Sequence, residues 1–403
     1  MATSKNPHWL ANVLDKPYDR VSWLITHNAF NNKPDIGQNV DPNQHYGIQD
    51  QLTDGVRALM LDIHPLDGGL RLQHGGSHGS SYADLCELLG RLKTFLDKHP
   101  KEIVTLYCES YGDIATELEE TFKGKGPGTG DFTGRIDWNV FPYLYHRPKP
   151  RHGHETVDRH KWPTIRELID SNQRLVVFRE LHDTKSTAPF DALDWYLDQW
   201  EYTCESPWNM KNWDDLQENT TNIPGRGKHG APIFTLYHQP SGTTGGSAGF
   251  ASSANLDEYL YARSMIAWKL TGKRPSPAVD FYRAGDKMPA QINTLDTCER
   301  LNKLKEVHGQ LKFGSHLFGQ TVHVRNVENT RFASRAYGLD LSKYGTTEPD
   351  QDVKVYNTFS FPLVPGETVN YKFELPGFEF KPDHISVSDF SKDVNIDVLV
   401  RKL

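Results

Sequence analysis

The sequence predicts an α/β protein, a distorted (β/α)8 TIM-type barrel followed by a small antiparallel β-sandwich. Strand-like and helix-like patterns alternate from residue 21 to residue 305, which is typical of βαβ units around a parallel sheet. The strand-like segments are apolar at nearly every position, as in strands buried on both faces. After Gly314 the pattern changes to short alternating segments separated by Pro, Gly and Asp, which indicates antiparallel strands.

The elements of the predicted barrel follow in order along the chain. Helices are expected over 84–99, where apolar residues recur at helical spacing until Pro100, over 164–172 after Pro163, and over 255–270 and 288–305. Seven strands can be counted, at 21–26, 56–63, 103–110, 174–180, 201–205, 232–239 and 277–283. An open doubly wound sheet is the alternative, and the absence of a GxGxxG fingerprint after the first strand weighs against it.

Two domains follow from this pattern, a barrel at 1–314 and a β-sandwich at 315–403. The C-terminal strands are expected in segments such as TVHVRNV, TVNYKFEL and NIDVLVRKL. The sandwich holds no catalytic cluster, so its role is open between stabilising the barrel and docking on a membrane, a sugar or a protein.

Composition excludes several classes of function. With 45 basic and 52 acidic residues and a net charge of -7, the chain has no basic footprint for nucleic acid. No apolar run approaches the roughly 20 residues of a membrane span, so no transmembrane segment is expected. The N-terminus shows no secretory signal, which leaves a secreted or a cytoplasmic location open, as it does the oligomeric state. The four cysteines are widely spaced and form no zinc motif.

Chemically capable side chains gather where the predicted strands end. Barrel geometry brings the carboxyl ends of its strands to one mouth. The candidates at these ends are His27, Asn28, Asp62, His64, His74, Glu109, Arg179 and Asp280.

These residue types favour a metal-assisted phosphodiesterase. His27 and His74 suit a base and an acid, because imidazole titrates near neutrality. An amide oxygen with two carboxylates, as in Asn28, Asp62 and Glu109, suits a hard cation such as Ca²⁺ better than zinc. Such an ion neutralises the charge of a phosphodiester under attack.

The same residues lie in motifs that resemble the X region of phosphatidylinositol-specific phospholipases C. The motifs are THNAF (26–30), GVRALMLDIHP with LRLQHG (55–74) and EIVTLYCES (102–110), and WPTIRELI with QRLVVF (162–178) and GKRPSPAVDFY with GD (272–286) extend the match. The likeness is greatest to the X-domain-only proteins of plants and bacteria, and it covers most of residues 20–305.

The resemblance implies cleavage of a phosphatidylinositol-type lipid to diacylglycerol and a cyclic inositol phosphate. His27 matches the general base on the inositol 2-hydroxyl, and His74 matches the acid that protonates the departing oxygen. Asn28, Asp62 and Glu109 match calcium ligands of the metal-dependent branch. Arg179 matches a cation that binds substrate phosphate, and Asp280 is either a site residue or a hydrogen-bonding residue of the barrel.

Two positions depart from the family pattern. Met60 stands where the metal-dependent enzymes carry a further carboxylate, and His64 stands where the metal-free bacterial enzymes carry an arginine. Asn28 and Glu109 favour Ca²⁺ as the expected cofactor, in a site weakened by one missing anionic ligand, and a metal-free mechanism is the alternative. His64 is open between a phosphate contact, a stand-in for the missing arginine and a bystander. A phosphodiesterase for another lipid headgroup, of the sphingomyelinase D type, and a non-catalytic headgroup-binding protein are the competing functions. In each case the partner is a phospholipid at a membrane surface.

Overall fold

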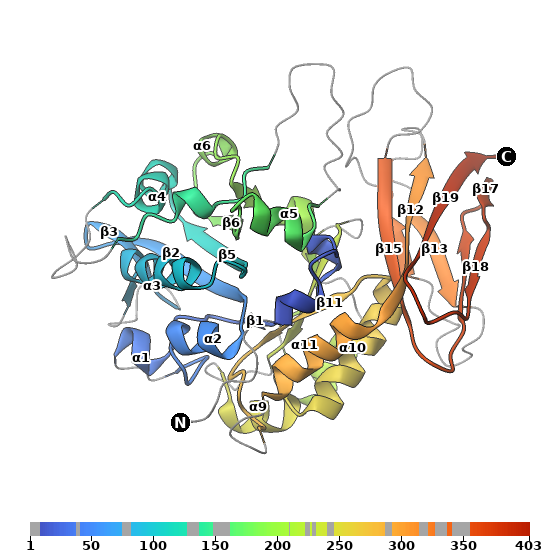
Figure 1. The fold of residues 1–403 in the computed structure, drawn as a ribbon, viewed down its shortest axis with the longest axis horizontal. Coiled ribbons are helices and arrows are strands. Elements are labelled where there is room, and N and C mark those ends of the chain that lie inside the picture. Colours follow the sequence, from blue (N-terminus) through green and yellow to red (C-terminus); the bar gives the residue numbers. More distant parts are fainter. Residues whose placement is uncertain are drawn as a thin grey trace.

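A curled and mostly parallel sheet forms the N-terminal part of the molecule (Figure 1). The computed structural model describes residues 9–37, 41–74, 82–126, 137–147, 162–208, 210–221, 226–227, 231–239, 246–286, 292–313, 321–326, 337–340 and 355–403. The strands of this sheet are β1 (Ile25–Thr26), β2 (Ala58–Leu66), β3 (Gly69–Leu72), β4 (Ala83–Asp84), β5 (Val104–Tyr111), β6 (Leu175–His182), β7 (Tyr196–Asp198), β8 (Thr203–Glu205), β9 (Arg226–Gly227), β10 (Ile233–His238) and β11 (Pro275–Val279). Their order is β7-β6-β5-β2-β1-β11-β10-β8-β9, and β3 and β4 extend β2 as an antiparallel branch.

The predicted α/β class is confirmed, whereas the closed eight-stranded barrel is not. From β7 to β8 every neighbouring pair in the order is parallel, as βαβ units require. Over the described residues the sheet stays open, because its edge strands β7 and β9 do not pair with each other. β7 ends after three residues, since the Asp198 side chain accepts a hydrogen bond from Trp200 N at 2.9 Å and begins a helix there. The fold is thus a curled, incomplete barrel.

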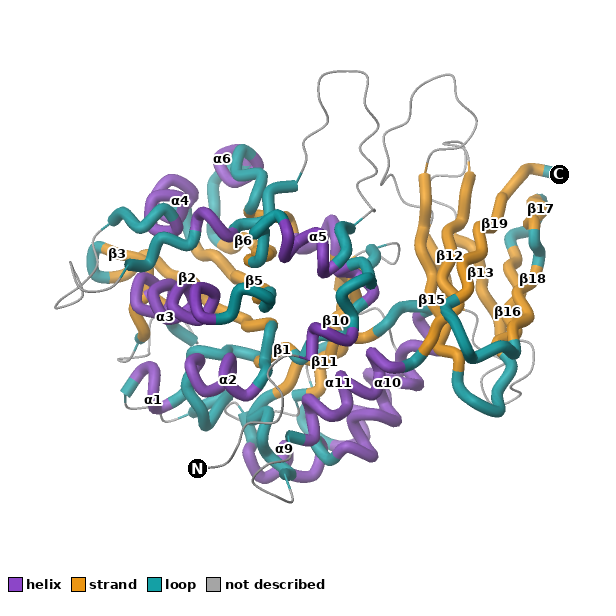
Figure 2. The backbone as a smooth tube through the Cα atoms, in the orientation of Figure 1, coloured by secondary structure: helices purple, strands orange, loops and turns teal. Residues whose placement is uncertain are grey.

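Helices line the outside of the curl (Figure 2). They are α1 (Lys33–Ile36), α2 (Ile48–Asp54), α3 (Leu85–Lys98), α4 (Ala115–Phe122), α5 (Ile165–Asp170), α6 (Ala188–Asp191), α7 (Gln199–Tyr202), α8 (Trp213–Thr221), α9 (Ala248–Ala254), α10 (Asp257–Thr271) and α11 (Asn293–Lys303), with 3-10 turns at Trp9–Asn12, Tyr18–Arg20 and Phe141–Tyr143. In α3 the predicted apolar positions are buried, and Asp84 caps its first turn through Cys86 N.

Side chains alternate between two cores along each strand. The outer core, between sheet and helices, includes Leu59, Leu61, Leu106 and Val177. The inner core, inside the curl, includes Ala58, Met60, Tyr107 and Phe178. Side chains alternate between the two faces along a strand. Every second residue after an inner-core residue therefore also faces the inside of the curl. Toward the carboxyl ends of the parallel strands, these residues point into the open end of the curl, here called the mouth.

Two four-stranded sheets form the C-terminal part. One sheet has the order β15 (Val355–Leu363), β12 (Lys305–Phe313), β19 (Val394–Lys402) and β17 (Phe378–Lys381). The other has the order β14 (Tyr337–Asp340), β13 (Thr321–Asn326), β16 (Val369–Glu374) and β18 (His384–Val387). Residues of both sheets share one apolar core. The β12–β19 pair is parallel, so the predicted purely antiparallel pairing is wrong at this pair. β12 lies before the predicted boundary at residue 314, yet it pairs with β15 and β19.

A buried ionic junction joins the C-terminal sheets to the curled sheet. Glu306, at the start of β12, accepts a hydrogen bond from Arg20 Nε at 2.6 Å and pairs with Arg274 Nη2 at 3.1 Å. Trp268 of α10 donates from Nε1 to Ser360 of β15. Arg20 and Arg274 precede β1 and β11, so this junction lies at the amino ends of the parallel strands, opposite the mouth.

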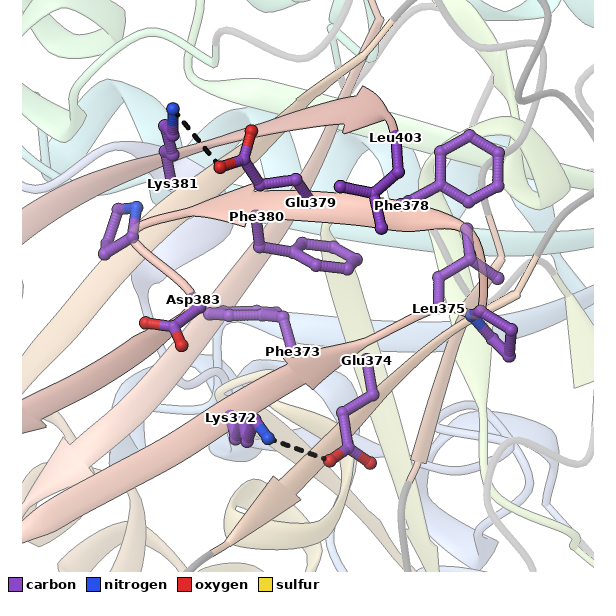
Figure 3. A pocket seen from close by; sticks show the side chains of 12 residues that line it. Lys372, Phe373, Glu374, Leu375, Phe378, Glu379, Phe380, Lys381, Asp383 and Leu403 are labelled. Carbon is purple, nitrogen blue, oxygen red and sulfur yellow. Dashed lines mark ion pairs between the residues drawn. The ribbon is translucent and has the colours of Figure 1, made fainter.

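The C-terminal sheets also carry an open groove of about 840 Å³ (Figure 3). Its apolar floor includes Phe373 and Phe380, which belong to the core of these sheets, and ion pairs between Lys372 and Glu374 and between Lys381 and Glu379 flank it. The described residues that line this groove include no histidine. The proton-transfer chemistry predicted from the sequence has to be sought at the mouth of the curled sheet instead.

Candidate active site

His27 lies directly after β1 and is held by a carboxylate from the neighbouring strand. Its backbone N donates to Val279 O at 3.0 Å, which continues the β1–β11 pairing by one residue. That register places Asp280 beside it, and His27 Nδ1 lies 2.8 Å from Asp280 Oδ1. Asp280 is 2% exposed and the His27 side chain 22% exposed. Since Nδ1–H donates to Asp280, the lone pair of Nε2 is left to accept a proton.

His74 is joined to the same network from the other side. Its Nδ1 lies 2.9 Å from Asn28 Nδ2 and 3.4 Å from Asp62 Oδ2. The hydrogen bond to Asp62 raises the pKa of His74, against the opposing effect of burial. Asn28 takes a left-handed backbone conformation at φ 43°, which asparagine tolerates better than most residues. When His74 Nδ1 carries no proton, it can accept a hydrogen bond from the Asn28 amide. When Nδ1 is protonated, it can donate to the Asp62 carboxylate.

Asn43 connects the two histidine clusters. Its Oδ1 accepts from Asn28 Nδ2 at 3.3 Å, and its Nδ2 donates to Asp280 Oδ1 at 3.1 Å. A continuous hydrogen-bonded chain therefore runs from His27 to His74 through buried side chains, which fixes both imidazoles relative to each other.

Three carboxylates lie in one row beside the histidines. Asp62, Glu109 and Glu180 are register neighbours on β2, β5 and β6, and they continue the inner rows of Met60, Tyr107 and Phe178. Burial, together with the charges of Asp62 and Glu180, raises the pKa of Glu109. The row forms an anionic wall of the mouth.

A second row, of stacked rings, lies two residues further along the same strands. The ring of Tyr111 stacks on His64 at 4.1 Å and on His182 at 4.8 Å. His182 Nε2 approaches Glu109 at 3.7 Å and Glu180 at 3.6 Å. Burial lowers the pKa of His64, so its neutral form is favoured. This row forms the rim of the mouth.

Arg226 closes the seam that the backbone leaves open between the sheet edges. From β9 it reaches Glu205 of β8, with Nη2 at 2.8 Å, and Glu180 of β6, with Nη1 at 3.1 Å. Gly227 permits this approach, because at φ 77° a Cβ would lie 2.5 Å from Thr203 O. Burial raises the pKa of Glu205 to about 7, although Arg226 opposes the shift.

The structure brings together most of the residues predicted from the sequence. His27, Asn28, Asp62, His74 and Asp280 form one network, Glu109 lies beside Asp62, and His64 lies at the rim. Their roles stay predictions.

Arg179 lies apart from this network. It occupies the outer face of β6, where it pairs with Asp191 at 2.5 Å and lies over Phe190. Strand alternation explains the difference, since Arg179 and Glu180 must face opposite ways.

Sequence reasoning missed several residues of the mouth, among them Tyr111 and His182 of the rim. Glu180 could have been found from the alternation of β6. Glu205 ends a strand as Asp62 and Glu109 do, which is the same signal. Asn43 and Arg226 lie in polar segments without periodicity, where no comparable pattern marks them.

With His27 as the general base that the sequence predicts, replacing Asp280 with asparagine is expected to lower turnover of a phosphodiester substrate about tenfold to a hundredfold. This is a part of the roughly 10²–10⁴-fold that a general base contributes. The neutral amide no longer stabilises the imidazolium of His27 or selects its tautomer. Steady-state kinetics should show the loss in kcat with little change in KM. A change confined to KM would contradict a role through His27.

Comparison with known proteins assigns the class to which this fold and site belong. The PI-PLC X family model (PI-PLC X 1) matches residues 13–239, more than half of the chain. The chain belongs to the PI-PLC X family, which confirms the resemblance found in the sequence. Membership supports a phosphodiesterase-type, lipid-related function.

Individual relatives match part of the chain. A PI-PLC X domain-containing protein of Arabidopsis thaliana is 29% identical over 199 residues, 47% of this chain and 41% of that protein. PI-PLC X domain-containing protein 1 of Arthroderma benhamiae is 26% identical over 226 residues, 56% of this chain and 65% of that protein. In both cases the match spans less than two thirds of the relative.

Solved structures with a partial likeness include bacterial phosphatidylinositol-specific phospholipases C. A mutant of the Staphylococcus aureus protein aligns with a TM-score of 0.48 at 14% identity, over 74% of this chain and 98% of that chain. The Listeria monocytogenes protein aligns with a TM-score of 0.43 at 14% identity, over the same shares.

Proposed function

We propose that this protein is a phosphodiesterase that cleaves phosphatidylinositol-type lipids to diacylglycerol and a cyclic inositol phosphate. The observation that carries the proposal is the pair His27 and His74, each oriented by its own carboxylate at one mouth and linked through Asn43 and Asn28. Two oriented imidazoles are what an acid–base relay needs, whereas binding alone requires neither.

The residues act in a defined order in this proposal. His27 Nε2 takes the proton of the ring hydroxyl adjacent to the phosphodiester, and that oxygen attacks phosphorus. The bond from phosphorus to the glycerol oxygen breaks as protonated His74 gives its proton to the departing oxygen. Asp280 stabilises the imidazolium of His27, and the hydrogen bond to Asp62, which raises the pKa of His74, favours its protonated form. Water opens the cyclic product by the reverse use of the two histidines.

Ca²⁺ is the cation we propose for this site, held by Asn28, Asp62 and Glu109. These side chains offer hard oxygen donors. Asp62, Glu109 and Glu180 are neighbours in the sheet, so their carboxylates concentrate negative charge that a cation would offset. When bound, the ion neutralises charge on the phosphodiester. Among the described residues, no group of three His, Cys, Asp or Glu side chains is arranged to hold a metal ion by itself. In the proposal, water and substrate oxygens therefore complete the set of calcium ligands.

The decisive experiment measures diacylglycerol and cyclic phosphate released from phosphatidylinositol vesicles, with and without a calcium chelator. Cleavage is expected, with a loss of about a hundredfold or more on chelation. Cleavage that the chelator leaves unchanged would contradict the calcium proposal but not the histidine relay. A folded protein that cleaves only another headgroup, or binds headgroups without turnover, would instead favour a sphingomyelinase D-like enzyme or a headgroup-binding protein.

Calorimetric titration tests the ion without relying on activity. With only two carboxylates, the expected affinity is weak, with a dissociation constant of about 10⁻⁴–10⁻³ M. Glu109→Gln and Asp62→Asn should each weaken binding further. Unchanged affinity in both variants would place the ion elsewhere.

The substrate is a lipid, so the protein has to work at a membrane surface. None of the helices in the described ranges has the length and apolar character needed to cross a bilayer. Contact with phospholipid at the surface of the membrane is part of the proposal.

A further inference from the structure

The groove on the C-terminal sheets lies along the edge of strand β17. β17 is the last strand of its sheet, and within the described ranges it pairs only with β19. All four of its residues, Phe378–Lys381, line the groove, whereas the residues paired with them, Leu399–Lys402, do not. The groove of about 840 Å³ therefore lies on the side of β17 away from β19, where a further strand could be added.

The floor of this groove is apolar. Phe380 of β17 and Phe373 of β16 project toward each other, with ring centroids 6.0 Å apart (Figure 3). Leu375 and Phe378, which also line the groove, are only partly buried. A strand laid beside β17 would cover these side chains and extend the sheet, so the groove offers both apolar contact and backbone pairing.

The direction of the backbone groups of β17 follows from its register with β19. Leu403 N donates to Gly377 O at 3.0 Å, so these two residues form a hydrogen-bonded pair. Such pairs alternate with non-hydrogen-bonded pairs along antiparallel strands. Counting from Gly377, residues 379 and 381 direct their N–H and C=O groups toward β19, and residues 378 and 380 direct theirs to the other edge.

Phe380 is the residue of β17 best placed to pair across that edge. Phe378 N already donates to Leu375 O at 3.1 Å, across the turn that leads into the strand. If two copies of β17 meet antiparallel with Phe380 opposite Phe380, these residues exchange two backbone hydrogen bonds about a two-fold axis. Such a self-complementary contact is typical of a cyclic dimer.

The charges on β17 favour this register. Glu379 and Lys381 flank the buried Phe380, their side chains are 42% and 62% exposed, and they pair with each other at 3.2 Å. An antiparallel copy centred on Phe380 would set each Glu379 opposite Lys381 of the other copy. The neighbouring registers, centred on residue 379 or on residue 381, would set Glu379 opposite Glu379 or Lys381 opposite Lys381. Like charges directly opposite each other are unfavourable.

We infer that β17 is the docking edge for a second copy of this chain, paired antiparallel about Phe380, which joins two four-stranded sheets into one of eight strands. Charged residues usually discourage pairing at a sheet edge. On β17 the acid and the base lie on either side of the centre of pairing, so an antiparallel copy complements them. The strand is four residues long and the interface is small, so the expected dimer is weak, with a dissociation constant of about 10⁻⁵ M. The inference does not depend on the proposed function.

Analytical ultracentrifugation of the full chain, at concentrations from tenfold below to tenfold above the expected dissociation constant, tests the inference. Wild type should pass from monomer to dimer over this range. Glu379→Lys and Lys381→Glu should each raise the dissociation constant about tenfold or more, because both symmetry-related pairs change from attraction to repulsion. A wild-type chain that stays monomeric throughout would overturn the inference and leave the groove to a different partner.

Restored complementarity separates the effect of charge from a loss of folding. The double variant Glu379→Lys with Lys381→Glu reverses the order of the charges and should dimerise as wild type does. An equimolar mixture of the two single variants should form a mixed dimer that is tighter than either homodimer, because each pair then joins opposite charges.

The matched control is Lys303→Glu, on α11, where the lysine side chain is 66% exposed. It should keep the wild-type dissociation constant. A dimer that neither single variant weakens, or a double variant and a mixture that fail to restore dimerisation, would overturn the assignment of the interface to β17.

Discussion

Replacing His27 or His74 with alanine is expected to abolish most turnover of phosphatidylinositol, by about 10²–10⁴-fold for each. His27 Nδ1 lies 2.8 Å from Asp280, and in the described part of the chain no hydrogen bond engages its Nε2, while His74 is held by Asp62 and Asn28. Because the two groups act in one relay, the double variant should lose little more than either single variant. Release of cyclic phosphate from vesicles measures all three.

The control is His146→Ala. His146 also pairs with an aspartate, Asp194 at 2.8 Å, but it lies outside the mouth and is 37% exposed in its side chain. Its replacement should leave the rate unchanged. Circular dichroism and thermal unfolding verify that each variant is folded. Near-normal turnover in folded His27→Ala or His74→Ala would refute the two-histidine relay.

Replacing Glu306 with glutamine is expected to lower the free energy of unfolding by about 3–5 kcal/mol, the usual cost of removing one partner from a buried ion pair. Glu306 is completely buried between Arg20 and Arg274, which would keep their charges without it. Urea unfolding at pH 7 measures the difference. Glu367→Gln is the matched control, because Glu367 also pairs across the junction, with Lys269, but is half exposed. An exposed pair contributes at most about 1 kcal/mol.

The same carboxylate predicts a pH dependence. Burial alone would raise the pKa of Glu306, but attraction to Arg274 and Arg20 outweighs it and holds the pKa well below the ordinary 4.5. A depressed pKa in the folded state stabilises the fold above the pKa of the unfolded state, and this stability is lost as pH falls below it. The difference in free energy of unfolding between wild type and Glu306→Gln should be constant near neutrality and should decrease below about pH 4.5. A gap independent of pH would contradict the ionic junction.

The ends of the strands could be predicted from the sequence because each is marked by residues adjacent in the chain. Each apolar run stops at a polar residue, and in a parallel sheet these ends share one edge, so His27, Asp62 and Glu109 could be placed together before any coordinates. Alternation along a strand is also local, and applying it to β6 would have chosen Glu180 over Arg179.

What the sequence could not reveal depends on register between distant segments. The contact of His27 with Asp280 joins residues 253 positions apart and follows only from the β1–β11 pairing. The opening of the barrel depends on where β7 stops, which is decided by the Asp198 cap rather than by a hydrophobic pattern. Arg226 lies in a two-residue strand, too short for any periodicity.

The open seam also bears on edge-to-edge association between chains. An incomplete barrel has two edges whose backbone groups could pair with another chain, a route to edge-to-edge aggregation that closed barrels lack. Here one edge strand has three residues and the other two, and Arg226 sets a charge on the shorter edge. Short, charged edges offer little template for a foreign strand, so the seam can stay open without recruiting a second copy.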